Sequence, residues 1–113
     1  MEDLAKVYIL IPLYNEATVI EGLVKQLSSV FKNIVIVNDG ATDDSQEILE
    51  KLDIHLINHP INMGQGSAIS TGFNYIYETD AKALITFDAD GQHSVEDAKI
   101  FAYEILKSES DII

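Results

Sequence analysis

The chain has 113 residues, and its 7 Lys and Arg against 19 Asp and Glu give a formal net charge of −12. A surface this acidic repels phosphate backbones, which excludes nucleic acid as a partner. Because 47% of the residues are apolar, the chain can bury the core of one domain, and a disordered chain is also excluded. The absence of cysteine excludes disulfides and thiolate metal sites and fits a cytoplasmic protein.

The first third of the chain predicts two strands joined by a helix. The run Val7–Ile11 is rich in β-branched residues, which is typical of a strand buried on both faces, and Pro12 is expected to end it. Apolar residues then recur every three or four positions over 19–31, which predicts an amphipathic helix that Asn15 can cap. A second buried strand is expected over Ile34–Val37.

The remaining elements continue the alternation. In chain order we expect a short helix carrying Ile48, Leu49 and Leu52 and capped by Thr42 or Asp43, a weaker strand over 54–57, a helix from about 67 to 78 and a strand over 83–87. A further helix begins at the capping box 94–97, and a strand is expected to enter at 111. The apolar stripe of that helix is formed by Ala98, Phe101, Ala102, Ile105 and Leu106. This pattern predicts an α/β fold with a mostly parallel sheet and helices on both faces. No apolar run is long enough for a membrane span or a signal peptide.

Parallel sheets bind ligands beyond the carboxyl ends of their strands, where the strand order reverses, and all four predicted strand ends here are polar. The fourth end carries Asp88 and Asp90, separated by one small residue. Their mutual repulsion is relieved if a divalent cation, Mg²⁺ or Mn²⁺, sits between them and an anionic ligand, and Gln92 can add a carbonyl oxygen. The alternative is a solvated acidic turn in which Gly91 supplies backbone freedom.

The other strand ends offer groups for a planar ligand. Asp39 precedes Gly40, so its carboxylate can accept a hydrogen bond from a base N–H while the backbone approaches closely; the alternative is an Asx turn or a helix cap. Tyr14 can stack on a ring or pack at the strand end. The histidines His55 and His59 flank the weak third strand, where packing explains them, and we assign them no chemistry.

The glycines at 64 and 66 fit neither a dinucleotide fingerprint nor a Walker loop. A dinucleotide fingerprint would need a glycine at Ile69, and a Walker loop would need Gly-Lys-Ser/Thr. The glycines still permit a tight loop close to a ligand, and Ala68 with Gly72 would let the following helix pack closely on the sheet.

Four motifs, taken together, resemble one family. They are Ile-Pro-Leu-Tyr-Asn-Glu at 11–16, Ile-Val-Asn-Asp-Gly-Ala-Thr-Asp at 36–43, Asn-Met-Gly-Gln-Gly-Ser-Ala at 62–68 with Gly72, and Phe-Asp-Ala-Asp-Gly-Gln-His at 87–93. In this order and spacing they resemble the inverting family-two glycosyltransferases with a GT-A fold. The resemblance is greatest to the dolichyl-phosphate mannose and polyprenyl-phosphate glucose synthases.

The resemblance implies a role for each matched position. Pro12, Tyr14 and Glu16 would line a nucleotide pocket, and Val37 and Asp39 would hold the base. Asp88 and Ala89 would lie near the ribose and phosphates, and the catalytic Asp90 with Gln92 would bind the Mg²⁺ or Mn²⁺ that bridges the diphosphate. Two departures, Asn38 for an acid and Ala41 for a serine, are expected to weaken contacts with the base or ribose.

The implied reaction is the inverting transfer of a hexose from a GDP- or UDP-hexose to a polyprenyl phosphate or a saccharide. Members of the family are about twice as long or longer, so residues 1–113 are expected to be the donor-binding part, ending as a fifth strand begins and inactive alone. The exposed edge would favour self-association, and the whole protein would act at the cytoplasmic face of a membrane.

Two other functions are compatible with an α/β domain of this kind. A non-catalytic nucleotide-binding module differs from the enzyme only in the half that is absent. A phospho-receiver domain is the less favoured of the two, because it needs an aspartate at the end of its third strand, where this chain has Asn58 and His59.

Overall fold

The computed structural model describes residues 4–89 and 95–107, the last three of these by backbone alone. Its elements are η1 (Leu4–Lys6), β1 (Val7–Leu13), α1 (Ala17–Ser28), β2 (Asn33–Asp39), α2 (Ser45–Glu50), β3 (His55–His59), α3 (Gln65–Tyr77), β4 (Ala83–Thr86) and α4 (Val95–Lys107). The predicted alternation of strands and helices is confirmed, with most boundaries moved by one or two residues. The strand expected from 111 lies outside the described residues.

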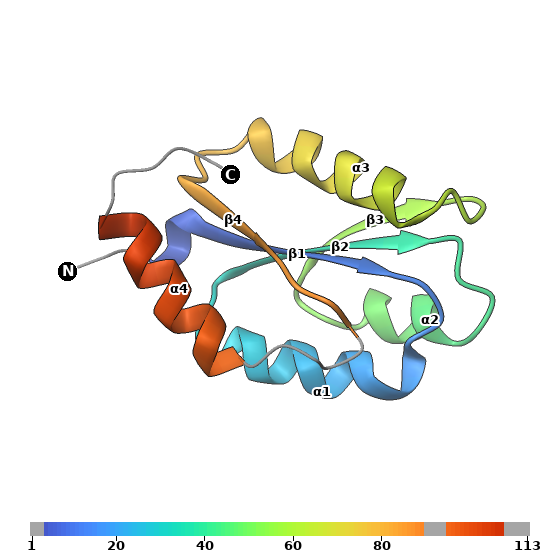
Figure 1. Ribbon diagram of the computed structural model, residues 1–113. Helices are drawn as coiled ribbons and strands as arrows, with labels where there is room; N and C mark the ends of the chain where they lie inside the picture. Colours follow the sequence, from blue (N-terminus) through green and yellow to red (C-terminus); the bar gives the residue numbers. More distant parts are fainter. Residues whose placement is uncertain (1–3, 90–94, 108–113) are drawn as a thin grey trace.

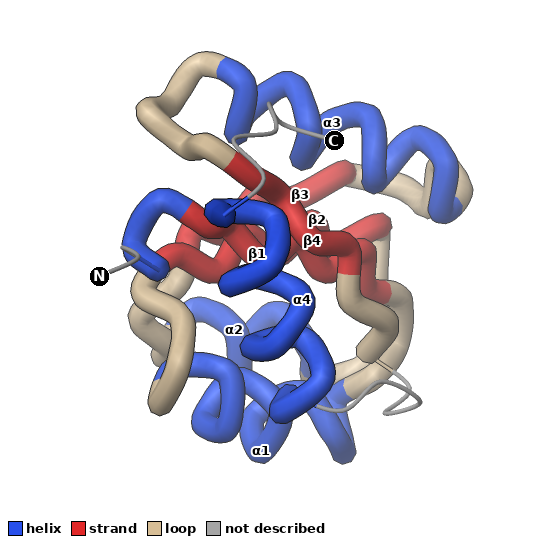
Figure 2. The backbone as a smooth tube through the Cα atoms, turned by 60° about the vertical axis from the view of Figure 1, so that its left-hand side comes forward, coloured by secondary structure: helices blue, strands red, loops and turns tan. Residues whose placement is uncertain are grey.

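The four described strands form one parallel sheet in the order β3-β2-β1-β4. Helix α3 covers one face, and α1, α2 and α4 lie on the other (Figures 1 and 2). The chain moves outward from β1 to β3 and then returns to place β4 on the opposite side of β1. The strand order therefore reverses between β1 and β4, which is where an open α/β sheet has its ligand crevice.

Alternating strand side chains build two apolar layers. Residues such as Ile9, Ile11 and Ile36 pack toward α1, whose Ile20 and Leu27 are fully buried. On the other face, Leu10, Val35 and Val37 pack with Ala68 and Ile76 of α3. Burial of each Ile, Leu or Val side chain among them stabilises the fold by about 1.5–3 kcal/mol.

Strand β1 continues through Pro12, where the sequence analysis predicted its end. The carbonyl of Leu10 accepts a hydrogen bond from the Phe87 N–H at 2.9 Å, so alternate residues of β1 direct their backbone groups toward β4. Pairing with β4 ends at Leu10. The missing N–H of Pro12 therefore costs the sheet no ladder hydrogen bond.

Helix α4 buries part of its predicted apolar stripe. Among its described side chains, Ala98 and Ala102 are buried as predicted, whereas Phe101 is 50% exposed. The two alanines lie four residues apart on one ridge, and their small side chains let the helix approach the sheet. No helix within the described ranges is long and apolar enough to cross a membrane.

The packing role predicted for Gly72 is confirmed. A Cβ atom at this position would overlap with the side chain of Leu10 in β1. Glycine therefore lets α3 lie directly on the sheet, next to the fully buried Ala68. Because α3 begins at the carboxyl edge of the sheet, this close packing also fixes the position of its first turn.

Candidate functional site

A pocket of about 340 Å³ opens at the carboxyl ends of the strands. It is lined by the last residues of β1 and β2, by residues that follow β1, β3 and β4, and by the start of α3: Pro12, Leu13, Tyr14, Glu16, Asp39, Asn62, Gly64, Gln65, Ala68, Asp88 and Ala89. It thus lies at the reversal of strand order, and its volume suits a small-molecule ligand.

The pocket is acidic. Glu16, Asp39 and Asp88 contribute carboxylates, and the described lining contains no Lys or Arg. A negatively charged ligand therefore needs a cation or backbone N–H groups to bind here. Carboxylate oxygens are hard donors of the kind that Mg²⁺ and Mn²⁺ prefer, so the donor chemistry fits such an ion.

The predicted metal ligands Asp90 and Gln92 lie outside the described residues. In the part of the chain that the structure describes, no group of three or more His, Asp or Glu side chains is placed to hold a metal ion. The half-buried Asp88 and the buried Ala89 are the lining residues nearest to the predicted ligands in the sequence.

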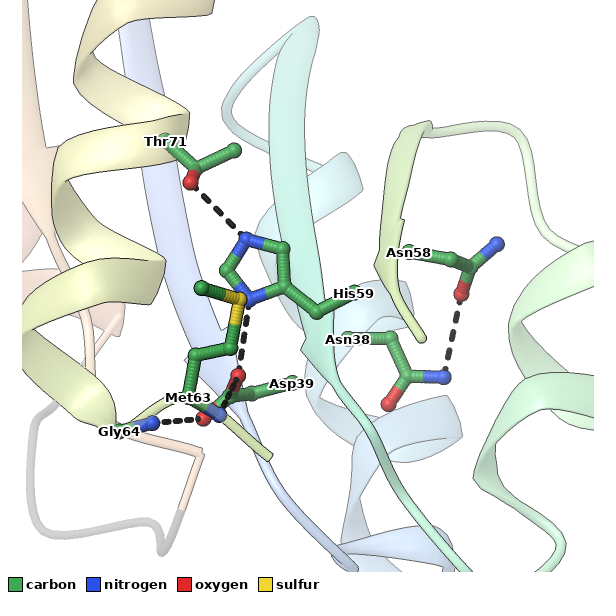
Figure 3. Close-up of polar contacts among 7 residues, drawn as sticks. All are labelled: Asn38, Asp39, Asn58, His59, Met63, Gly64 and Thr71. Atoms are coloured by element: carbon green, nitrogen blue, oxygen red, sulfur yellow. Dashed lines mark hydrogen bonds and ion pairs between the residues drawn. The ribbon is translucent and has the colours of Figure 1, made fainter. Parts of the chain in front are cut away.

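Asp39 accepts three hydrogen bonds at the edge of the pocket (Figure 3). Its Oδ1 accepts hydrogen bonds from the Met63 N–H at 2.9 Å and from Nδ1 of His59 at 2.8 Å. Its Oδ2 accepts one from the Gly64 N–H at 2.9 Å. The carboxylate thus holds the loop between β3 and α3 against the end of β2. Gly40 allows this, because a Cβ there would overlap with the backbone of residues 61–62.

These bonds also set the charge of Asp39, whose exposed fraction is 3%. Burial alone would raise the pKa of the carboxyl, but the hydrogen bonds from the His59 ring and from the Met63 and Gly64 N–H groups outweigh burial. They hold the pKa of Asp39 below its ordinary value, and the side chain is an ionised acceptor at neutral pH.

A second group of hydrogen bonds joins the loops after β1 and β2. Asn15, with φ 54°, accepts hydrogen bonds through Oδ1 from the N–H groups of Thr42 at 2.8 Å and Asp43 at 3.3 Å. In return, Asp43 Oδ2 accepts one from the Ala17 N–H at 3.3 Å. The expectation that Asn15 caps α1 is therefore wrong: Asp43, from a different loop, bonds to the first turn of that helix.

The structure brings together six of the predicted site residues: Pro12, Tyr14, Glu16, Asp39, Asp88 and Ala89 all line the pocket. Val37 does not reach it, because it is fully buried in the apolar layer under α3. Asn38 is also buried and points to the opposite face from Asp39, where its Nδ2 donates to Asn58 Oδ1 at 3.2 Å (Figure 3). The departure at position 38 therefore lies away from the pocket.

The sequence analysis missed His59 and Thr71. His59 Nε2 lies 2.9 Å from the Thr71 hydroxyl, so the ring links Asp39 to α3. The available signal was strand parity: His59 and Asp39 are register partners on adjacent strands, and register partners in a sheet present their side chains to the same face.

The likeness of this parallel sheet to solved glycosyltransferase structures assigns it to the nucleotide-binding half of the GT-A fold. The solved structure of glucosyl-3-phosphoglycerate synthase from Mycobacterium tuberculosis, in complex with Mn²⁺, uridine diphosphate and phosphoglyceric acid, has this fold. It matches with a TM-score of 0.61 and 16% identity over 74% of this chain and 32% of that chain.

The model of glycosyl transferase family 2 matches residues 8–113, and the chain belongs to this family. The UDP-N-acetylglucosamine–dolichyl-phosphate N-acetylglucosaminyltransferase of Methanococcus voltae is 31% identical over an alignment of 125 positions, which covers 95% of this chain and 50% of the relative. The undecaprenyl-phosphate 4-deoxy-4-formamido-L-arabinose transferase of Proteus mirabilis is 36% identical over 109 residues, covering 85% of this chain and 32% of the relative. The chain thus spans half or less of the length of these relatives.

Proposed function

We propose that the chain is the donor-binding part of a metal-dependent, inverting glycosyltransferase that moves a hexose from a nucleotide diphosphate sugar to a polyprenyl phosphate. The observation that carries this proposal is the acidic pocket at the strand-order reversal, lined by Tyr14, Glu16, Asp39 and Asp88. The pocket has room for a small ligand and no described basic side chain for a diphosphate, a combination that fits a ligand bound together with a cation.

In this proposal each wall of the pocket has one task. The ionised Asp39 accepts a hydrogen bond from the base, and the 45% exposed Tyr14 stacks on it. Asp88 and Ala89 lie beside the ribose and phosphates. Asp90 and Gln92 hold Mg²⁺ or Mn²⁺, which, when bound, stabilises the charge that develops on the diphosphate leaving group.

A polyprenyl phosphate suits this chain as the acceptor for two reasons. The relatives from M. voltae and P. mirabilis are named for transfer to dolichyl phosphate and to undecaprenyl phosphate. A phosphate oxygen is also ionised at neutral pH, so it attacks without a strong general base, whereas the hydroxyl of a saccharide acceptor would need one. Because such acceptors are membrane lipids, we place the reaction at the cytoplasmic face of a membrane.

Calorimetry on the 113-residue chain tests the donor site. UDP and GDP are each titrated with and without Mn²⁺ or Mg²⁺. We expect one of them to bind at least about tenfold more tightly with the metal, because an unscreened diphosphate is repelled by the pocket carboxylates. Equal affinity with and without metal would contradict metal dependence, and no binding of either nucleotide would contradict the donor site itself.

The acceptor is tested separately, in a protein with the length of the relatives. Transfer of radiolabelled sugar from the nucleotide that the chain binds is measured onto a short polyprenyl phosphate and onto a free saccharide. Label in the lipid phase alone is expected. Label in the saccharide alone would overturn the acceptor assignment and leave the donor site intact.

A further inference from the structure

The imidazole of His59 lies between a pocket residue and helix α3. Because the ionised Asp39 can only accept hydrogen bonds, Nδ1 of His59 carries the hydrogen and donates it to Oδ1. In the neutral ring, Nε2 then accepts the hydrogen of the Thr71 hydroxyl at 2.9 Å. The His59 side chain is 10% exposed and that of Asp39 is 4% exposed, so neither bond competes with bulk water.

A second histidine makes the same kind of bridge at the other end of β3. His55 Nε2 lies 3.1 Å from Asn33 Oδ1 on β2, and its Nδ1 lies 2.9 Å from the hydroxyl of Tyr75 on α3. Both histidines therefore link β2 to α3 on one face of the sheet. They differ in that only the bridge through His59 ends on a residue that lines the pocket.

The hydrogen bonds of the Asp39 carboxylate leave one of its acceptor positions free. A carboxylate has about four lone-pair positions, two on each oxygen. Oδ1 receives hydrogen bonds from His59 and Met63, and Oδ2 receives one from Gly64. One position remains, on Oδ2 of a side chain that lines the pocket.

We propose that His59 is a positioning residue for base recognition: with Thr71 behind it, it fixes Asp39 so that its last acceptor position selects a base with a ring N–H. The inference rests on the proposed function, which already names UDP or GDP, and adds the residue that positions the acceptor of the base. Uracil presents N3–H and guanine presents N1–H to such an acceptor, whereas cytosine and adenine have an acceptor nitrogen at the corresponding position. A fixed carboxylate favours the first pair and repels the second.

The experiment compares nucleotides that differ in this ring nitrogen. Calorimetry with Mn²⁺ present gives the affinity ratios UDP to CDP and GDP to ADP for the unmodified chain. For the pair whose base fits the pocket, pyrimidine or purine, we expect an affinity ratio of at least about tenfold. A ratio of this size corresponds to one hydrogen bond to a charged group. Comparable binding of both members of each pair would overturn the inference while leaving the donor site in place. If none of the four nucleotides binds, the proposed function fails first.

Four variants then separate positioning from general stability. His59→Leu is expected to lower the affinity ratio, UDP to CDP or GDP to ADP, about tenfold. His59→Asn is expected to keep most of that ratio, because its Nδ2–H₂ group donates to Asp39 in place of Nδ1–H. His55→Leu is the matched control: it removes an equivalent bridge and lowers Tm, but the ratio stays unchanged. Thr71→Val keeps the shape of its side chain without the hydroxyl and is expected to lower the ratio by a smaller factor.

Two results would contradict the assignment. One is a His59→Leu protein that still discriminates as the unmodified chain does. The other is an equal loss of discrimination in His55→Leu, which would make the effect a general loosening of α3. If His59→Leu fails to fold, Thr71→Val is measured instead, and Thr71→Ser, which restores the hydroxyl, is expected to restore the affinity ratio. An unchanged ratio in Thr71→Val would contradict a role of the His59–Thr71 hydrogen bond in positioning Asp39.

Discussion

Asn15 Oδ1 accepts a hydrogen bond from the N–H of Thr42 at 2.8 Å, across 27 positions in the sequence. The bond joins the loop after β1 to the loop after β2. Tyr14 and Glu16, on either side of Asn15, line the pocket. Asn15 thus holds one pocket wall in place without lining the pocket itself.

Two substitutions of Asn15 separate its hydrogen bonds from its backbone conformation. Asn15→Gly removes the side-chain bonds but tolerates a φ of 54°, so we expect a loss of about 1 kcal/mol. Asn15→Ala removes the same bonds and adds the cost of a left-handed residue, about 1 kcal/mol more. Urea unfolding followed by circular dichroism measures both. Equal stability of the two variants would mean that the left-handed backbone carries no cost here.

Glycines of α3 give a second prediction. Gly72→Ala places a Cβ against the Leu10 side chain and is expected to destabilise the chain by about 1–3 kcal/mol. Gly66→Ala, in the same helix, meets no atom within contact distance and is expected to stabilise it by about 0.5–1 kcal/mol. Thermal unfolding should therefore move the two Tm values in opposite directions. A rise in Tm for both would contradict the close packing of α3 on β1.

The sequence predicted the sheet well because its signals are local. Short runs of β-branched residues such as Val7–Ile11 mark strands buried on both faces, wherever those strands end up in the sheet. Strand order and register are not local. The bridge from Asp39 through His59 to Thr71 exists because positions 39 and 59 are register partners, and no pattern within either segment states that pairing.

The same distinction explains the errors. An asparagine two residues before a helix is a good local cap, but Asn15 bonds instead to a loop that the fold brings beside it. Phe101 has the correct spacing for the predicted apolar stripe of α4, yet it is 50% exposed, whereas Ala98 and Ala102 on the same stripe are buried. Six of the predicted pocket residues came together because carboxyl ends of parallel strands share one edge, a rule that needs no knowledge of register.

The hydrogen bonds of Asp39 predict a dependence of stability on pH. Its pKa is lower in the folded chain than in the unfolded chain, so its contribution is complete above the unfolded pKa of about 3.9. That contribution is lost as the pH falls through the folded pKa. Asp39→Asn should be less stable at pH 7 by about 1–3 kcal/mol, because an amide has one acceptor oxygen for three donors. It should also lose less stability between about pH 5 and pH 3 than the unmodified chain does.

Urea unfolding at several pH values measures this difference. The control is Asp53→Asn, a change at an exposed aspartate that carries the same charge. The control is expected to follow the acid dependence of the unmodified chain. Parallel acid dependence in all three proteins would contradict a lowered pKa at Asp39.

The proposed metal site gives the last prediction. Asp90→Ala is expected to abolish most of the gain in UDP or GDP affinity that Mn²⁺ provides in calorimetry, because it removes a proposed ligand. Its free energy of unfolding should change by no more than about 0.5 kcal/mol, as for an ordinary surface substitution. Asp53→Ala controls for the loss of one negative charge and should retain the full effect of Mn²⁺. A large loss of stability in Asp90→Ala, with the metal effect intact, would instead assign Asp90 to the acidic turn that follows β4.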